Sequence, residues 1–371
     1  MTKAAELAKM GEVLTNSQIG GRRNIAYNGA MQISQRGTQT GQGGAEAMSA
    51  LDRFKLFGGS TDGRLTSSQD SDSPVGFGNS LKLDCTTADA SVAAGEFLLL
   101  EQRIEGQDLQ QLKYNQSSAE TSTISFYVKG NASAQYTFAL QYHLSGGTAR
   151  WFTKGFAVTT DWTRVVITIP GDTQASSGSD YGIANDNATG ANLMIWLHGG
   201  TNFSSGTHQD TAWADRDYTK LFQDNQTSFF DSTDRTFFIT GFQFELGSQA
   251  TPFEHRSFGE EEQLCQRYFY RYIEGNNQSI MTAAGIIANY IQGNINFPTP
   301  MRAAPSFAAS SGTNYYQLYS TNSASWDDLS GQQFHKNGCT LLKNGATITS
   351  GHAAIVYSNN SAVTIDFDAE L

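Results

Sequence analysis

The chain has few charged residues, and few of those are basic. Asp, Glu, Lys and Arg make up 16% of the 371 residues, whereas about a quarter is usual for globular proteins. The 35 acidic residues outnumber the 24 basic ones, which gives a formal net charge of −11. Proteins that bind nucleic acids need basic surface to replace the counterions of the phosphates. The charge balance therefore argues against nucleic acid as a partner.

Long apolar runs are also missing. No segment approaches the roughly 18–20 consecutive apolar residues that cross a bilayer as a helix. The first residues, MTKAAE, lack the apolar core of a secretory signal peptide. We therefore expect no membrane insertion, and we expect synthesis in a cytosol without export by that route.

Cysteine is scarce, and its spacing carries no metal or redox motif. The three residues Cys85, Cys265 and Cys339 lie far apart and form no CxxC or Cys/His pattern. Such residues are better explained as buried thiols in a reduced compartment than as disulfides or a zinc site. The sequence therefore predicts free cysteines and no cofactor.

Glycine and aromatic residues are plentiful by contrast, with 37 Gly and 12% aromatics. Between residue 24 and about residue 258, apolar and polar residues alternate in segments separated by Gly, Ser, Asn and Asp. The clearest alternating segments are 123–129, 136–142, 165–169, 193–197 and 238–246. A period of two predicts strands with one apolar face each. We therefore predict an all-β protein whose residues 23–258 form an antiparallel β-sandwich.

The two ends of the chain differ from this central region. In residues 1–22, Leu7, Met10 and Leu14 have helical spacing and a Gly-ended stretch follows, which predicts a short helix and a linker. A frayed tail is the alternative, since so short a helix is marginal alone. Residues 259–371 predict a smaller β-domain. It begins with one or two helical turns at EEEQLCQRYFY, and its short strands are expected at 280–297, 314–320, 339–342, 353–357 and 363–368.

Several motifs occur in an informative order. The outer pair are NIAYNGAMQISQRGT at 24–38 and ITGFQFELGS at 239–248, continued by ATPFEHRS at 250–257; between them lie DRF at 52–54, QRIEG at 102–106 and SFYVK at 125–129. Together these segments resemble the jelly-roll module of tail-fibre and other virion proteins of tailed bacteriophages. The outer pair resemble its opening and closing strands, and we expect these two strands to lie close together. FY at 126–127 stands where the family more often has Phe-Trp. PTPMRAAP at 298–305 and the ending IDFDAEL are similar to phage-fibre segments as well.

The resemblance implies a jelly roll of the galactose-binding or carbohydrate-binding-module kind. It also implies a non-enzymatic virion component on the tail or particle exterior, assembled in the host cytoplasm. Such a protein would bind a host surface glycan through several copies at once. We expect a homotrimer joined mainly through residues 259–371, with residues 1–22 docking onto other virion proteins. The alternatives are a structural or adaptor virion protein that contacts only other virion proteins, and a glycan depolymerase.

The candidate glycan site lies in the polar and aromatic stretch 199–235. Sugars stack on aromatic rings, and carboxylates fix their orientation by hydrogen bonds. Trp213, Tyr218, Asp215 and Asp217 have this chemistry. The alternative for Trp213 is a structural plug that fixes a long loop across the sandwich.

The remaining candidates concern subunit contacts, metal and catalysis. Dense aromatic residues predict an oligomer interface at Tyr268, Phe269 and Tyr270. The segment 176–192 offers Asp180, Asn185, Asp186 and Asn187, for which turns are favoured over a calcium site, so no metal is expected.

No catalytic motif is present, and no residue is assigned a catalytic role. The nearest carboxylate pairs in sequence are Glu101 with Glu105 and Asp366 with Asp368. Alternate residues of one strand share a face, so their spacing would allow glycoside hydrolysis. Such pairs also occur by chance in surface strands, and we expect no enzyme.

Overall fold

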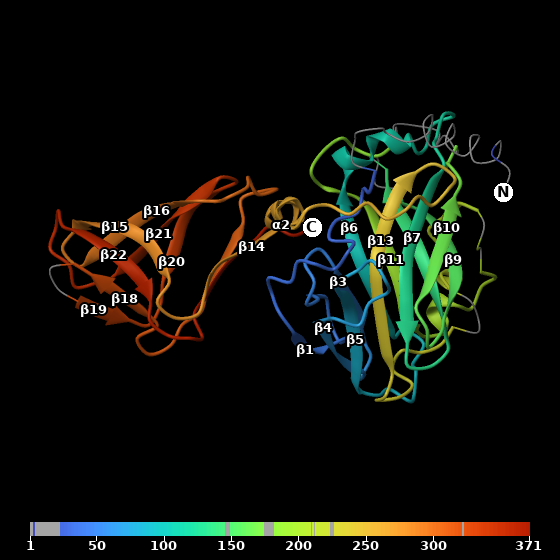
Figure 1. Cartoon of the computed structure of the whole chain (residues 1–371), viewed down its shortest axis with the longest axis horizontal. Helices are drawn as coiled ribbons and strands as arrows, with labels where there is room; N and C mark the ends of the chain where they lie inside the picture. The colour runs from blue at the N-terminus through green and yellow to red at the C-terminus, as the bar shows by residue number, and fades with distance from the viewer. Residues whose placement is uncertain are drawn as a thin grey trace. The chain divides into compact units, whose positions relative to one another are not determined.

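The computed structural model describes Lys3 and residues 23–371, apart from 145–148, 174–181, 209, 211, 223–225 and 321–322. The helix and linker predicted over residues 1–22 thus lie outside the described residues, except for Lys3. The chain divides into two compact units, residues 1–261 with Leu371 and residues 262–370 (Figure 1). The sequence predicts this boundary between residues 258 and 259.

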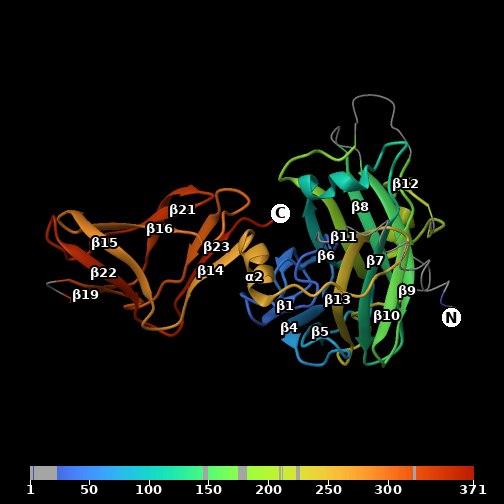
Figure 2. The same ribbon diagram turned by 45° about the horizontal axis from the view of Figure 1, so that its top comes forward.

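The first unit is an antiparallel β-sandwich, as predicted. Sheet A has the order β1 (Gln39–Gln42), β4 (Arg64–Asp70), β5 (Ser80–Thr87), β13 (Thr236–Leu246), β7 (Ser122–Gly130), β10 (Thr163–Ile169). Sheet B has the order β12 (Ala214–Asp215), β9 (Ala149–Val158), β8 (Ala134–His143), β11 (Thr189–Gly199), β6 (Phe97–Glu105), β3 (Lys55–Gly59), β2 (Ala47–Met48). Figures 1 and 2 show the two layers. The 3₁₀ turns η1 (Gly106–Leu112), η2 (Thr201–Phe203) and η3 (Tyr218–Lys220) lie in the connections.

Aromatic side chains fill the space between the sheets. Phe126 of β7 is fully buried, and its ring lies 6.4 Å from Phe138 of β8 and 5.3 Å from Phe156 of β9. Tyr136 and Phe237 meet edge to face at 5.6 Å across the same gap. Burial of each such ring stabilises the fold by about 1.5–3 kcal/mol. The alternating pattern of the sequence therefore produces this core directly.

The motif at residues 24–38 lies against β13, as its position in the family implied. The amide of Phe242 donates to Gly29 O at 2.9 Å, and the amide of Ile25 donates to Phe244 O at 2.7 Å. Met31 and Ile33 are buried beside this contact region, at 0% and 2% exposure. The predicted closeness of the two motifs is therefore found.

The same motif is not a strand, however, and this part of the prediction is wrong. Asn28 and Met31 have φ angles of 52° and 55°, in the left-handed region that strands do not use. The Asn28 amide group stabilises this turn, because Nδ2 donates to Ile33 O and Asp52 O while Oδ1 accepts from the amide of Ile33. Asn tolerates positive φ and its side chain bonds to nearby backbone, so it favours turns. The prediction of a strand did not take this preference into account.

The second unit contains two further antiparallel sheets. Helix α2 (Phe258–Gln266) spans the boundary between the units and precedes the first strand. One sheet has the order β14 (Phe269–Glu274), β23 (Thr364–Asp368), β17 (Ser306–Ala309). The other has the order β19 (Ser323–Trp326), β18 (Tyr316–Tyr319), β22 (Ala353–Ser358), β15 (Ser279–Ile287), β16 (Tyr290–Asn296), β21 (Gly338–Asn344), β20 (Ser330–His335). The all-β prediction for this region is confirmed, including the short helix before the first strand.

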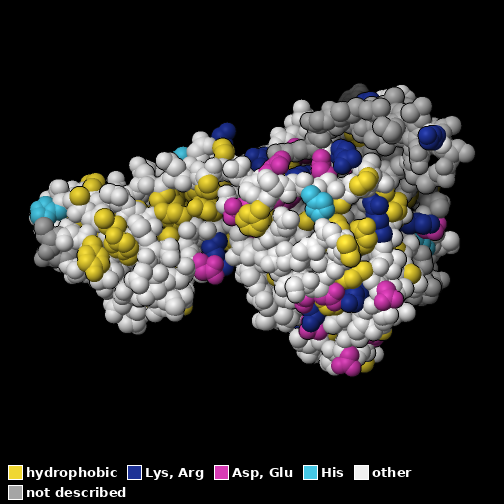
Figure 3. All heavy atoms as spheres, in the orientation of Figure 1, with side chains coloured by type: hydrophobic (Ala, Val, Ile, Leu, Met, Phe, Trp, Pro, Cys, Tyr) yellow, Lys and Arg dark blue, Asp and Glu magenta, His cyan; other side chains and the backbone are white. Residues whose placement is uncertain are grey.

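The structure also shows the state of the cysteines and the distribution of basic side chains on one face. All three cysteines are free and buried. Burial raises the pKa of the Cys85 thiol to about 11 and that of Cys339 to about 12, so both are poor nucleophiles at neutral pH. On the face shown in Figure 3, Lys and Arg side chains stand in small separate groups, several of them beside Asp or Glu side chains. Among the described residues, no helix is long and apolar enough to span a bilayer.

Candidate functional site

Part of the outer face of sheet B is covered by the long connection after β11. Side chains that point away from sheet A form an apolar cluster with this connection: Leu99, Ala139, Trp151, Met194, Trp196, Leu221 and Phe222. Strand β8 is consequently buried on both faces along nearly its whole length. The connection is therefore packed onto the sheet, and its residues 212–221 have a defined position over β9.

A surface groove of about 620 Å³ lies between β9 and this connection. Trp151 and Thr153 of β9 form one wall, and Asp215, Asp217 and Tyr218 line the other. The Tyr218 side chain is 47% exposed, whereas Trp151 is only 6% exposed. Their rings meet edge to face at 6.2 Å. Three of the four residues predicted for the glycan site thus come together in one hollow.

Charged groups surround the exposed ring. The Arg216 guanidinium lies 4.9 Å from the centre of the Tyr218 ring, and both residues line the groove. Asp217 caps η3, since its Oδ1 accepts from the amide of Thr219 at 3.0 Å, and its Oδ2 pairs with Lys220 at 3.0 Å. The hydrogen bond from Thr219, followed by that from Lys220, holds the pKa of Asp217 below its usual range. Its carboxylate is therefore ionised at neutral pH.

Asp215 is held from behind by a buried arginine. Arg150 Nη1 lies 2.6 Å from Asp215 Oδ1, and the Asp215 side chain is nevertheless 75% exposed. Arg150 itself is buried and bonds to Asp172 on its other side, with Nε 2.7 Å from Oδ2. This chain of charges fixes one rim of the groove to the end of the sandwich. The exposed part of Asp215 remains able to accept hydrogen bonds from a ligand.

Trp213 faces away from these residues. Its ring packs against Tyr114 and Tyr142 at 5.1 Å each and against Phe152 at 5.8 Å. Its Nε1 donates to Pro170 O at 2.6 Å. Trp213 is not among the residues that line the groove. This placement matches the alternative interpretation of Trp213 as a plug that fixes the connection.

Sequence reasoning missed Trp151 and a row of polar side chains that continues from it. The strand registers put Gln141 of β8 opposite Trp151, Asn192 of β11 opposite Gln141, and Arg103 of β6 opposite Asn192. Glu101 lies beside this row, with Oε1 2.6 Å from Arg103 Nη2. Burial raises the pKa of Glu101, and the charge of Arg103 opposes this shift. The row extends the polar part of the outer face beyond the groove.

The predicted carboxylate pairs do not form open acid–base pairs. Glu101 is ion-paired as described, and Glu105 accepts from Gln107 Nε2 at 2.6 Å. Arg271 holds both oxygens of Asp366, at 2.9 Å and 3.0 Å. These bonds give the carboxylates structural roles.

The loop considered for calcium is described only in part. Asp180 lies outside the described residues. Asp186 Oδ1 accepts from the amide of Ala188 at 3.0 Å, and Asp186 O accepts from the amide of Gln107 at 2.9 Å. The bond from Ala188 is that of an Asx turn, which agrees with the turn interpretation, and the bond from Gln107 ties this turn to the start of η1.

The aromatic residues proposed for subunit contact are largely covered within one chain. Tyr268 is 0% exposed and Phe269 is 3% exposed. Tyr270 is half-buried and stacks on Phe367 with ring centres 6.4 Å apart. Because the first two rings have almost no free surface, a subunit interface in this region would need other residues. The trimer itself stays a prediction.

Comparisons with known proteins give low similarity throughout. No family model matches the chain, and no curated protein matches it by sequence. It is similar to the enzymatically active domain of tailspike protein 4 of bacteriophage CBA120, with 10% identity and a TM-score of 0.31 over 60% of this chain, and it spans 21% of that structure. A putative sugar binding protein from Bacteroides thetaiotaomicron is similar over 61% of this chain and 100% of that one, with 12% identity and a TM-score of 0.32.

A tandem of two carbohydrate-binding modules is similar over a longer stretch. This is the N-terminal CBM22-1-CBM22-2 tandem domain of Xyn10C from Paenibacillus barcinonensis. The match covers 94% of this chain and 98% of that one, with 10% identity and a TM-score of 0.29.

Proposed function

We propose that the protein binds a carbohydrate in the groove between Trp151 and Tyr218 and carries out no reaction on it. The observation that carries this proposal is the half-exposed Tyr218 ring, fixed on a packed connection and flanked by Asp215 and Arg216. A sugar presents an apolar C–H face and a rim of hydroxyl groups. The tyrosine ring offers the surface for the first, and the charged side chains offer acceptors and donors for the second.

A single sugar bound in the groove is expected to be held weakly. The two carboxylates of the groove are already bonded to basic neighbours, Asp215 to Arg150 and Asp217 to Lys220, which leaves only part of their hydrogen-bonding capacity for a ligand. Firm attachment then requires several copies, whose effective concentration adds to the affinity of each site. This reasoning supports the multivalent mode of binding implied by the phage-fibre motifs.

The same motifs support a place on the exterior of a bacteriophage particle, in a tail fibre or similar attachment component. We extend the proposal to a homotrimer whose residues 1–22 bind other virion proteins. Light scattering on the purified chain tests the trimer, and a stable monomer at micromolar concentration contradicts it. Deletion of residues 1–22 tests the anchor, which requires unchanged folding of the rest and loss of incorporation into particles.

A hydrolytic role is disfavoured by the chemistry of the groove. A general acid needs a carboxyl group that keeps its proton near neutral pH, which requires a raised pKa. The pKa of Asp217 is lowered instead, because Thr219 and Lys220 bond to its carboxylate. We therefore assign binding rather than cleavage, and release of reducing sugar from host polysaccharide would contradict this assignment.

The direct test compares two exposed tyrosines. Tyr218→Ala removes the proposed stacking surface, and Tyr319→Ala removes a ring of similar exposure, 56%, on β18. Loss of an aromatic anchor usually weakens binding by about 2 kcal/mol, or roughly 30-fold. We expect this loss for Tyr218→Ala on a glycan array and in titration calorimetry, and none for Tyr319→Ala. Equal affinity of both variants for every bound glycan would refute the groove as the site.

A further inference from the structure

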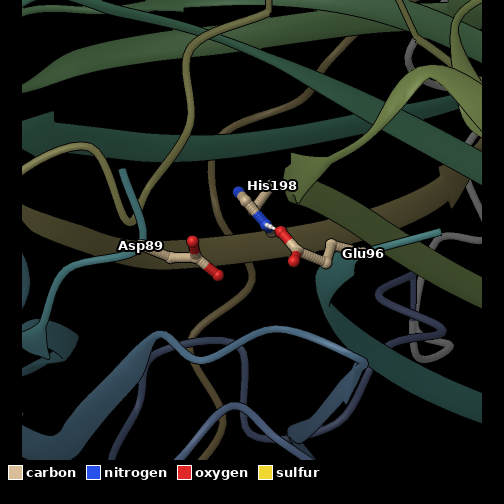
Figure 4. A group of neighbouring side chains, drawn as sticks. All are labelled: Asp89, Glu96 and His198. Carbon is tan, nitrogen blue, oxygen red and sulfur yellow. Dashed lines mark ion pairs between the residues drawn. The ribbon is translucent and has the colours of Figure 1, made fainter. Parts of the chain in front are cut away.

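Three side chains that no sequence motif connects converge inside the first unit. Asp89 lies between β5 and β6, Glu96 directly precedes β6, and His198 is on β11 (Figure 4). All three residues are buried, with exposures of 8%, 6% and 0%. Each offers one ligand atom, and these atoms lie within 4.8 Å of one another.

Two of the ligand atoms face each other without a hydrogen bond. His198 Nε2 lies 3.5 Å from Glu96 Oε2. Within the described part of the chain, neither atom has a hydrogen-bond partner. A buried polar atom without a partner destabilises the folded state, and more so when it is charged. Folded proteins rarely keep two such atoms side by side unless something binds between them.

The charges in this cluster call for a cation. Two buried carboxyl groups, those of Asp89 and Glu96, share this space with one imidazole. Carboxylate charges that are buried need a partner of opposite charge. A bound metal ion would neutralise both acids and accept the lone pair of the imidazole.

Neighbouring groups orient the Asp89 carboxylate and the His198 ring. Asp89 Oδ2 accepts from Thr61 Oγ1 at 2.9 Å and from the amide of Asp62 at 3.0 Å. His198 Nδ1 lies 2.7 Å from Ser228 Oγ. When Nδ1 donates to this hydroxyl, Nε2 presents its lone pair to the cluster. Metal-binding histidines are normally oriented by such a bond from their second nitrogen.

We propose that Asp89, Glu96 and His198 bind one divalent transition-metal ion, with Zn²⁺ as the best fit. Zinc binds imidazole nitrogen and carboxylate oxygen at about 2.0–2.2 Å, which puts neighbouring ligand atoms of a tetrahedron roughly 3.4 Å apart. The 3.5 Å between His198 and Glu96 agrees with this value. Calcium, by contrast, takes six to eight oxygen ligands.

The fourth zinc position would be taken by a water molecule or a second carboxylate oxygen. The ion would tie the segment before β6 to the end of β11 and stabilise the sandwich. Nothing in this role depends on the groove, so the proposal is independent of glycan binding.

The test uses the full chain, stripped with a chelator and then titrated with Zn²⁺. We expect one equivalent to bind, and the melting temperature to rise by about 5–10 °C at a hundredfold excess over Kd. Glu96→Gln and His198→Gln should each weaken binding at least tenfold. His335→Gln, which removes an exposed histidine on β20, should bind zinc as the unmodified protein does.

Three outcomes would overturn the proposal. The first is a folded unmodified protein that binds no zinc at micromolar concentration. The second is unchanged zinc binding by both Glu96→Gln and His198→Gln. The third is a melting temperature that rises with Ca²⁺ but not with Zn²⁺. If His198→Gln fails to fold, Glu96→Gln decides, because it keeps the side-chain shape and removes one charge.

Discussion

Trp213 and Tyr218 lie five residues apart in one connection, and they have opposite environments. Trp213 packs against three aromatic residues and donates to Pro170 O. Tyr218 leaves 47% of its side chain exposed above the groove. The first residue fixes the connection, and the second is available to a ligand. A residue type suited to sugar binding therefore indicates a site only when its ring is also left uncovered.

Arg150 bonds both to Asp215 at the groove and to the buried Asp172. Its replacement should have the largest effect on the free energy of unfolding. Arg150→Met would leave the buried Asp172 carboxylate without its guanidinium, and breaking a buried pair costs about 3–5 kcal/mol. Lys113→Met is the matched control, since it breaks an exposed pair with Glu120 that is worth less than about 1 kcal/mol. Urea denaturation measures both variants. Equal stability of the two variants would show that the buried Arg150–Asp172 pair contributes no more to stability than an exposed ion pair.

Trp213→Ala should have the next largest effect. It removes a ring that packs on Tyr114, Tyr142 and Phe152, and large aromatic truncations in packed regions cost about 3 kcal/mol. Tyr218→Ala should change the free energy of unfolding by less than about 0.5 kcal/mol, because exposed side chains contribute little. The same denaturation experiment measures both. A larger loss of stability from Tyr218→Ala than from Trp213→Ala would contradict the view that Trp213 fixes the connection and Tyr218 does not.

Asp217→Ala should reduce stability less than Trp213→Ala does, and it should also affect binding. The carboxylate caps η3 through the amide of Thr219, and loss of a cap costs about 1 kcal/mol. Because Tyr218 is the first residue of η3, the ring loses part of its fixed position. We expect glycan affinity to fall a few-fold in titration calorimetry. Asp217→Asn keeps an accepting oxygen and should retain most of the affinity.

The sequence predicted those parts of the molecule in which local pattern and tertiary environment agree. The alternating segments became β7, β8, β10, β11 and β13, and the acidic stretch that begins at Glu260 became part of α2. Asp215, Asp217 and Tyr218 were found together because they are close in the chain. For these three residues, closeness in the sequence was sufficient to predict closeness in the structure.

Other features depend on contacts that a local pattern does not encode. Trp151 was missed because β9 has aromatic residues on both faces, Trp151 outside and Phe152 inside, which hides the alternation. Trp213 has the residue type of a sugar-binding aromatic, and only the fold shows that its ring packs against Tyr114, Tyr142 and Phe152. Asp89 and His198 are more than a hundred residues apart, and only the pairing of β11 with β6 brings them together.

The most direct test of the groove as a glycan site is a structure of the protein with an oligosaccharide selected by the glycan array. We expect a sugar ring stacked on Tyr218, with hydroxyl groups within hydrogen-bond distance of Asp215 or Arg216. A sugar bound only elsewhere, for example on the row formed by Gln141 and Asn192, with the Tyr218 ring left uncovered, would contradict it.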